Sequence, residues 1–171
     1  FGLFVEGACN VLRGNFIGTT PGGMCAAPNI WDGIWVSGDS NLIGGVNAGD
    51  GNLIAACGRS GIHVDSGSGC EVRGNCIAGN IGDGIHISGA GFEAGHVVAG
   101  NRIGLFAPSC GAAGNGGHGV SLHDASGITL GGEDAACANR IGGNMGHGIV
   151  VSGSLSRAHA IMGNVIGVDA D

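Results

Sequence analysis

Gly33-Ile34-Trp35-Val36-Ser37-Gly38 is followed by two further short phrases, Asn41-Leu42-Ile43-Gly44-Gly45 and Gly51-Asn52-Leu53-Ile54, and the three together predict the fold. Each phrase is a short apolar strand bounded by Gly or Asn, residues that favour turns. The first phrase is repeated along the chain as Gly2-Leu3-Phe4-Val5, Gly61-Ile62-His63-Val64, Gly84-Ile85-His86-Ile87, Gly119-Val120-Ser121-Leu122 and Gly148-Ile149-Val150-Val151. A repeat of this kind predicts that each copy forms the same structural unit.

The spacing of the copies predicts a coil. The glycines that open the first phrase stand at positions 2, 33, 61, 84, 119 and 148, so the spacings are 31, 28, 23, 35 and 29 residues. The strand phrases keep their order while the spacing varies, which places the insertions in the corners of the coil. A sheet sandwich would need longer strands and hairpin turns. Each phrase is therefore expected to stack on its copy in the next coil.

Aliphatic residues fill the positions that strand alternation turns to one face. Successive side chains of a strand point to opposite faces, so the first and third residues after each opening Gly share a face. The aliphatic residues of the first phrase are Leu3, Val5, Ile34, Val36, Ile62, Val64, Ile85, Ile87, Val120, Leu122, Ile149 and Val151. The second strand adds Leu12, Ile43, Val72, Val98, Leu130 and Ile161, and the third adds Ile17, Ile54, Ile77, Ile103, Ile141 and Ile166. Three such columns predict an all-β fold, a parallel β-helix (β-solenoid) of about six coils of three short strands, with a triangular cross-section and residues 1–171 as a single domain.

An Asn residue precedes the third strand in every copy. Stacked Asn side chains can hydrogen-bond along a column, as amide ladders do in cross-β assemblies. We therefore predict a structural Asn ladder formed by Asn15, Asn52, Asn75, Asn101, Asn139 and Asn164.

Composition excludes several classes of partner. The chain has 171 residues, 40 of them Gly, and six basic residues against thirteen acidic ones give a net charge of -7. This charge, without a basic cluster, argues against nucleic acid or an anionic membrane as a partner. No apolar run approaches the roughly 18 residues of a membrane helix, and no signal peptide opens the chain. Because the chain begins at Phe1 without Met, we expect either a processed mature protein or a segment of a longer solenoid.

The repeat resembles that of a known family. The run Gly-Asn-x-Ile-Gly, a corner, Gly-x-Gly-Ile-x-Val-Ser-Gly and then Asn-x-Ile-Gly-Gly is similar to the repeat of the right-handed (pectin-lyase-like) parallel β-helix proteins of bacterial and archaeal cell surfaces, and it covers essentially the whole chain. The resemblance implies the fold and its right-handedness. It implies less about function, because this fold carries polysaccharide lyases, hydrolases, tailspikes, adhesins and structural filaments.

Two tripeptides resemble part of an active site. Gly117-His118-Gly119 and Gly146-His147-Gly148 are similar to the Gly-His-Gly of pectin-hydrolysing β-helix enzymes. Those enzymes also carry an Asn-x-Asp, a neighbouring Asp pair and an Arg-x-Lys element, and nothing in this chain matches them. Both tripeptides stand at repeat positions that Asp32, Ser60 and Asp83 occupy elsewhere. We interpret them as part of the repeat.

The remaining candidate chemistry is sparse. His63 and His86 share an outward position in adjacent coils, within reach of a bridging metal, but the sequence places no third ligand beside them. Asp32 and Asp83 come nearest to the carboxylate pair of a glycosidase, and the intervening coil puts them roughly 10 Å apart. We predict no catalytic residue, no metal site and no cofactor.

Outward apolar residues predict a contact surface. Phe4 and Trp35 share one outward column, Phe16 and Leu53 share another, and Trp31 lies in a corner. Exposed aromatic columns serve as sugar-stacking platforms or as protein contacts. We favour contact with another subunit for these five residues.

Cysteine usage predicts disulfides. Seven cysteines without a Cys-x-x-Cys pair of the metal-binding type are better explained by oxidation than by zinc, and this indicates an extracellular location. Cys25 and Cys57 follow the third strand in adjacent coils and form the candidate disulfide, if the corners bring their Cα atoms to roughly 5.5–6 Å. Cys110 and Cys137 are a weaker pair.

Three functional hypotheses follow. The first is an extracellular structural subunit that associates with copies of itself, end to end or laterally, into a fibre, tube or sheath. The second is a polysaccharide-active enzyme or tailspike-like depolymerase with a groove along one sheet. The third is a surface adhesin segment that binds a cell-surface glycan or a protein through its aromatic columns.

Overall fold

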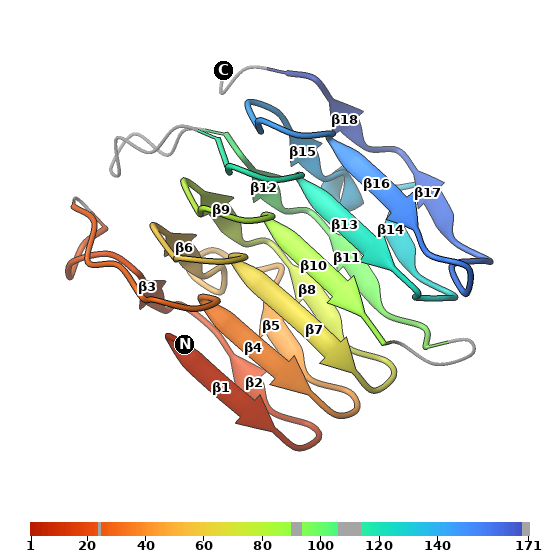
Figure 1. Ribbon diagram of the computed structural model, residues 1–171, viewed down its shortest axis with the longest axis horizontal. Coiled ribbons are helices and arrows are strands. Elements are labelled where there is room, and N and C mark those ends of the chain that lie inside the picture. The colour runs from red at the N-terminus through yellow and green to blue at the C-terminus, as the bar shows by residue number, and fades with distance from the viewer. Residues whose placement is uncertain (24, 90–93, 106–113, 169–171) are drawn as a thin grey trace.

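The chain winds as a stack of six coils. The structure, a computed structural model, describes residues 1–23, 25–89, 94–105 and 114–168. Each coil contributes one strand to each of three six-stranded parallel sheets, so the predicted three-sided parallel β-helix is confirmed (Figure 1). The described residues contain no helix long and apolar enough to cross a membrane. Their one helical segment is the short 3-10 turn η1 (Ala135–Cys137).

The strands of each sheet follow one another at intervals of one coil. Sheet 1 consists of β1 (Leu3–Glu6), β4 (Ile34–Ser37), β7 (Ile62–Ser66), β10 (Ile85–Ser88), β13 (Val120–His123) and β16 (Ile149–Ser152). Sheet 2 consists of β2 (Val11–Leu12), β5 (Leu42–Gly44), β8 (Glu71–Arg73), β11 (Val97–Ala99), β14 (Thr129–Gly131) and β17 (Ala160–Met162). Sheet 3 consists of β3 (Phe16–Ile17), β6 (Leu53–Ala55), β9 (Cys76–Ala78), β12 (Arg102–Ile103), β15 (Arg140–Ile141) and β18 (Val165–Ile166).

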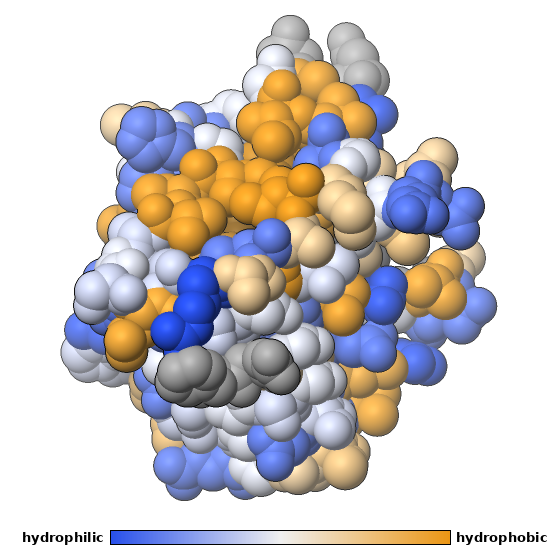
Figure 2. All heavy atoms as spheres, turned by 90° about the vertical axis from the view of Figure 1, so that its right-hand side faces the viewer, coloured by the Kyte–Doolittle hydropathy of each residue, from blue (hydrophilic) through white to orange (hydrophobic). Residues whose placement is uncertain are grey.

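The predicted aliphatic columns form the core. From the second to the fifth coil all of these inward side chains are buried, and each contributes about 1.5–3 kcal/mol by leaving water. Equivalent residues pair in register, as Ile85 does with Val120 and Ile62. In the sixth coil the residues of the same columns are exposed to solvent, among them Val151, Ile161 and Ile166. Figure 2 shows hydrophobic side chains gathered in the upper part of one face, the height at which the sixth coil lies in Figure 1.

The predicted Asn ladder is confirmed at the corner before sheet 3. Oδ1 of Asn75 accepts hydrogen bonds from the backbone N–H (3.0 Å) and the Nδ2 (2.8 Å) of Asn52 in the preceding coil. Nδ2 of Asn75 also donates to the carbonyl of Ile43 at 2.9 Å. The pattern repeats from Asn15 to Asn164. Each Asn therefore satisfies backbone groups that the turn removes from the sheets.

Each of the other two corners carries a column of side chains that accept backbone N–H groups, and neither column was predicted from the sequence; the column before sheet 2 is interrupted at Ile128, whose side chain has no acceptor. We name them after their first members. The Asn10 column, before sheet 2, contains Asn10, Asn41, Cys70, His96, Ile128 and His159. The Asn29 column, between sheets 3 and 1, contains Asn29, Cys57, Asn80, Asn115 and Asn144. In the Asn10 column chemically different residues share one position, just before each second strand. In the Asn29 column Asn recurs at four of five positions, and this repeat was the signal in the sequence.

The opening glycines are required by close packing. A Cβ added to Gly84 would lie 2.5 Å from Cγ2 of Ile103 and 2.7 Å from the carbonyl oxygen of Gly119. These distances are shorter than van der Waals contact, so only Gly allows the third-strand Ile to fill the corner. The glycine that begins each first phrase is thus a packing requirement of the core.

The predicted disulfide between Cys25 and Cys57 is wrong. Both are free thiols, as is every other cysteine in the part of the chain that the structure describes. Cys57 is fully buried in the Asn29 column, whereas Cys25 is exposed in the loop where Thr19 pairs with Ala26. Burial raises the pKa of the Cys57 thiol, as it does for Cys70. The second candidate pair involves Cys110, which lies outside the described residues.

The Asn15 ladder makes a first testable prediction. Replacing Asn101 by Ala leaves the buried N–H of Asn75 and the carbonyl of Val72 without their partner, and each unsatisfied group costs about 1–3 kcal/mol. Chemical denaturation should show the free energy of unfolding falling by about 3 kcal/mol or more. Asn15→Ala at the end of the same ladder is the matched control and should cost less than about 1.5 kcal/mol, because among the described residues nothing donates to its Oδ1. Equal losses would contradict the ladder.

The Asn10 column makes a second prediction, about pH. His96 is 1% exposed, and its Nδ1 accepts the backbone N–H of Cys70 at 3.0 Å, so protonation would break this bond. Burial lowers the pKa of His96, against opposing effects of the Asp39 carboxylate and the Gly67 carbonyl. The unfolded chain therefore binds a proton below about pH 6.5 while the folded chain does not, and stability falls as the pH drops below this value.

His96→Asn should flatten that dependence, because Asn already occupies the same column at position 41. Thermal unfolding between neutral and mildly acidic pH measures the change. Burial also lowers the pKa of His159, so part of the slope should remain. His123→Asn, at an exposed position, is the control. If both variants lose stability on acidification as steeply as the unmodified chain, His96 is not the group responsible.

Candidate functional site

The outer face of sheet 1 carries the most varied side chains of the repeat. Strand alternation and the register of the coils place the outward residues of successive strands in one line: Phe4, Trp35, His63, His86, Ser121 and Val150. A β-bulge between β4 and β7 shifts the register after Val36, so that Ser37 pairs with Ser66. The line changes from aromatic to imidazole between the second and third coils.

Aromatic side chains form one cluster at the first two coils. The rings of Phe4 and Trp35 stack with centroids 4.5 Å apart and an interplanar angle of 6°. The ring centroid of Phe1 lies 5.1 Å from that of Phe4 and 6.3 Å from that of Trp31. The guanidinium of Arg59 lies 4.2 Å over the Trp31 ring, within cation–π distance. Phe1 and Arg59 were not among the residues predicted from the sequence, although Arg59 is the repeat equivalent of Trp31 one coil later.

The structure therefore divides the five predicted contact residues. Phe4, Trp31 and Trp35 belong to the aromatic cluster. Phe16 and Leu53 pair with each other on sheet 3, a different side of the helix, where Phe16 is 54% exposed.

A column of polar residues borders sheet 1 at the corner where the chain enters it. Oδ1 of Asp32 accepts the backbone N–H of Ser60 at 2.9 Å, and Oδ1 of Asp83 accepts that of His118 at 2.7 Å. Nδ1 of His118 accepts the N–H of His147 at 2.9 Å, and these two imidazole rings stack at 5.2 Å. The Gly-His-Gly tripeptides thus have a structural role, with the imidazole in the position of a carboxylate.

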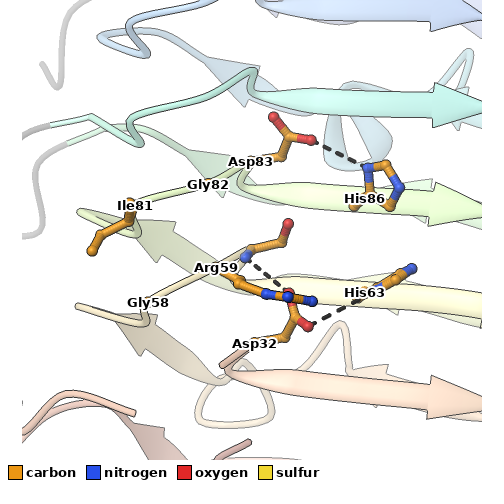
Figure 3. Close-up of a pocket in the computed structure, with 9 residues that line it drawn as sticks. Asp32, Gly58, Arg59, His63, Ile81, Gly82, Asp83 and His86 are labelled. Atoms are coloured by element: carbon orange, nitrogen blue, oxygen red, sulfur yellow. Dashed lines mark hydrogen bonds and ion pairs between the residues drawn. The ribbon is translucent and has the colours of Figure 1, made fainter. Parts of the chain in front are cut away.

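Two Asp–His pairs line a shallow pocket between the second and fourth coils. Nδ1 of His86 donates to Oδ2 of Asp83 at 3.2 Å, and Nδ1 of His63 lies 3.8 Å from Oδ2 of Asp32. The pocket has a volume of about 360 Å³, and Figure 3 shows Arg59 and both pairs around it. The centroids of the two imidazole rings are 4.8 Å apart. Oδ2 of each Asp, the oxygen that does not accept the corner N–H, lies beside Nδ1 of the neighbouring His.

Both carboxylates are held in their charged form. Burial by itself raises the pKa of Asp32, but the nearby His63 side chain, the hydrogen bond from the Ser60 N–H and the charge of Arg59 outweigh it, so this pKa is below its ordinary value. For Asp83 the same balance of burial against His86 and the His118 N–H also lowers the pKa. Both groups therefore accept hydrogen bonds at neutral pH.

The pocket presents both hydrogen-bond acceptors and a cationic donor. Asp83 fixes the His86 ring so that Nε2 is left as the acceptor, and Arg59 adds a cationic donor. Hydroxyl groups of a ligand could bond to these atoms while an apolar face lies against the nearby aromatic cluster. No group of three or more His, Cys, Asp or Glu side chains within the described ranges could hold a metal ion.

The chain is thus a three-sided parallel β-helix in which the outer face of sheet 1 carries aromatic and polar side chains. Comparison with known protein families, with curated proteins and with solved structures found no match to this chain.

The corner column makes a third prediction. Asp83→Ala removes the acceptor of the His118 N–H and should lower the free energy of unfolding by about 1–3 kcal/mol at neutral pH, as measured by chemical denaturation. Asp83→Asn keeps an acceptor and should restore most of this loss. Because the pKa of Asp83 is lowered in the folded state, its contribution is present above pH ~4 and disappears as the pH falls through the folded-state pKa.

The matched control for this prediction is Asp65→Ala. This carboxylate is 46% exposed and lies 3.7 Å from Nε2 of His63, so its removal should cost less than about 1 kcal/mol. Similar losses for Asp65→Ala and Asp83→Ala would show that the backbone hydrogen bond at the corner contributes nothing.

Proposed function

We propose that this chain is a structural β-helix subunit that associates with copies of itself into a fibre, tube or sheath outside the cell. The proposal includes no catalytic role and no cofactor. The free cysteines lend no support to the extracellular location, which stays a prediction.

One observation carries the proposal: the apolar columns of the core end on an exposed face. Ile161 and Ile166 are 44% and 51% exposed, whereas Leu130 and Ile141 at the same positions one coil earlier are 0% exposed. Leu155, Met162 and Val165 of the same coil are also exposed, and Figure 2 shows hydrophobic side chains gathered in the upper part of one face. An apolar face of this kind marks an interaction site. A further coil in register would cover it, and the proposal assigns that coil to a second copy.

The backbone supports the same assignment. β16, β17 and β18 are each the outermost strand of their sheet, as are β1, β2 and β3 at the opposite end of the stack. An outermost strand presents N–H and C=O groups that can pair with another chain. Both end coils therefore have hydrogen-bonding capacity for strands in parallel register.

A second candidate function is binding of a cell-surface glycan, as an adhesin or a polysaccharide-active protein would do. The aromatic cluster with Trp31 and Trp35, adjoining the pocket of Asp83, His86 and Arg59, favours it. Quenching of tryptophan fluorescence by neutral and acidic polysaccharides would measure such binding. We place it second because the aromatic cluster equally fits a protein contact.

Self-association is tested by sedimentation velocity and negative-stain electron microscopy of the unmodified chain over a wide range of concentration. We expect the sedimentation coefficient to rise with concentration and elongated particles to be seen. Ile166→Arg places a charge on the exposed face and should abolish the rise. Val46→Arg, at a loop position that is 82% exposed, is the matched control and should assemble normally.

An unmodified chain that stays monomeric at every concentration would contradict the proposal. So would assembly that Ile166→Arg leaves intact, since the contact would then lie elsewhere.

A further inference from the structure

A serine hydroxyl on the outer face of sheet 1 contacts an imidazole. Oγ of Ser88, the last residue of β10, lies 2.9 Å from Nε2 of His63 on β7, within hydrogen-bond distance. Ser88 follows His86 by two residues, so strand alternation turns its side chain outward as well. Ser88 is half-buried, and its hydroxyl can therefore be reached from solvent.

The other nitrogen of the same imidazole faces a buried carboxylate. Nδ1 of His63 lies 3.8 Å from Oδ2 of Asp32, as Figure 3 shows. The Asp32 side chain is 3% exposed, and its Oδ1 is fixed by the backbone N–H of Ser60 at 2.9 Å. Although burial raises it, the pKa of Asp32 stays below its ordinary value, so this group is an anion at neutral pH.

The surroundings of the ring decide which nitrogen of His63 carries the proton. Asp65 also approaches the ring, with Oδ1 3.7 Å from Nε2, but its side chain is 46% exposed and water and salt screen its charge. The buried Asp32 therefore favours the proton on Nδ1, which leaves Nε2 to accept the Ser88 hydroxyl proton. A hydroxyl that donates to a neutral imidazole, itself oriented by a carboxylate, is the arrangement that activates a nucleophile.

A second Ser–His contact on the same sheet lacks the buried carboxylate. Oγ of Ser152 lies 3.1 Å from Nδ1 of His123. The carboxylate beside that ring belongs to Asp124, which is 3.6 Å from Nε2 and 36% exposed, and the His123 side chain is 53% exposed. Of these two contacts, the one at Ser88 therefore combines the hydroxyl, the imidazole and a carboxylate shielded from water.

We propose that Ser88 is an activated nucleophile that hydrolyses neutral carboxylic esters, with His63 as its general base and Asp32 as the residue that positions His63. The activity goes beyond the structural role proposed above and leaves that role unchanged. It uses side chains of three successive coils, so it depends on the stacking of the β-helix and not on a single loop.

The reaction has two steps. Oγ of Ser88 attacks the ester carbonyl while Nε2 of His63 takes the hydroxyl proton. The C–O bond to the alcohol breaks, the same proton goes to the departing oxygen, and an acyl group remains on Ser88. Water then gives a proton to Nε2 and attacks the acyl carbon, the acid leaves, and the proton returns to Ser88. Asp32 stays ionised throughout.

The surroundings of Ser88 select the class of ester. Two carboxylates flank His63, Asp32 beside Nδ1 and Asp65 near Nε2, so an anionic ester is repelled. The Trp35 ring meets the His63 ring edge-on, with centroids 6.5 Å apart, and stacks on Phe4. An aryl or alkyl group of the ester therefore has apolar surface beside the base. We expect neutral aryl esters to react faster than anionic esters of the same size.

The test is labelling of the unmodified chain with a neutral alkyl fluorophosphonate. Oγ of an activated serine attacks the phosphorus, fluoride leaves and the adduct is stable, so peptide mass spectrometry identifies the labelled residue. We expect one label, on Ser88, and none on Ser152, which is the matched control. His63→Gln should slow the labelling by about 10²-fold or more, because a general base contributes about 10²–10⁴-fold. Circular dichroism shows beforehand that each variant is folded.

Hydrolysis of 4-nitrophenyl butyrate gives a second measurement, after iodoacetamide has blocked the exposed thiols of Cys9 and Cys25. Ser88→Ala should abolish the hydrolysis that the unmodified chain shows, and Ser152→Ala should leave it unchanged. Both serines lie on the outer face of sheet 1, so neither substitution opens a cavity in the core.

Asp32→Asn separates positioning from structure. It keeps an acceptor for the Ser60 N–H but removes the anion that favours a protonated imidazole, so the rise of the labelling rate with pH should move to lower pH. An unchanged pH profile would remove Asp32 from the proposal. Absence of label on Ser88, equal labelling of Ser88 and Ser152, or labelling that His63→Gln leaves as fast would each overturn the proposal, and none of these results bears on self-association.

Discussion

The backbone N–H groups at the corners of the coil need acceptors, and this need shapes the whole stack. A chain that turns every few residues removes these groups from the sheets while keeping them buried. Here a side chain of the next coil accepts them throughout the Asn15 ladder and at several coils in each of the other two corners. Asn is well suited to this task because its Oδ1 accepts two hydrogen bonds while its Nδ2 donates to a carbonyl, as Asn75 does. Because the corner N–H groups have hydrogen-bond acceptors, strands of only two or three residues can form a stable core.

The same constraint explains residues that look functional. Asp32, Asp83 and His118 each accept a corner N–H, so their first role is to hold one coil on the next. The buried thiol of Cys57 and the imidazole of His96 occupy positions in the other two corners that Asn fills elsewhere. Charged and nucleophilic side chains can therefore recur in this fold in a purely structural role. The atoms left over for ligands are those turned outward, such as Nε2 of His86.

Directionality is a second consequence. Each corner N–H that a ladder side chain accepts comes from the preceding coil, and the outer faces are free to differ from coil to coil. Sheet 1 changes from stacked aromatic rings to Asp–His pairs within three coils, while the core beneath it stays aliphatic. A uniform interior and a variable exterior suit a scaffold whose contacts are made by its surface and its ends.

The strands, the aliphatic columns and the Asn15 ladder could be predicted from the sequence, because one kind of residue recurs there at one repeat position. Features in which unlike residues share a position, or residues far apart in the chain meet, became visible only in the folded chain. It put Cys57 into a ladder instead of a disulfide, and it brought Phe1 and Arg59 to the aromatic cluster. The physical reason is that a corner N–H requires only an acceptor, which Asn, Asp and His all supply, so the shared role is not visible as a repeated letter.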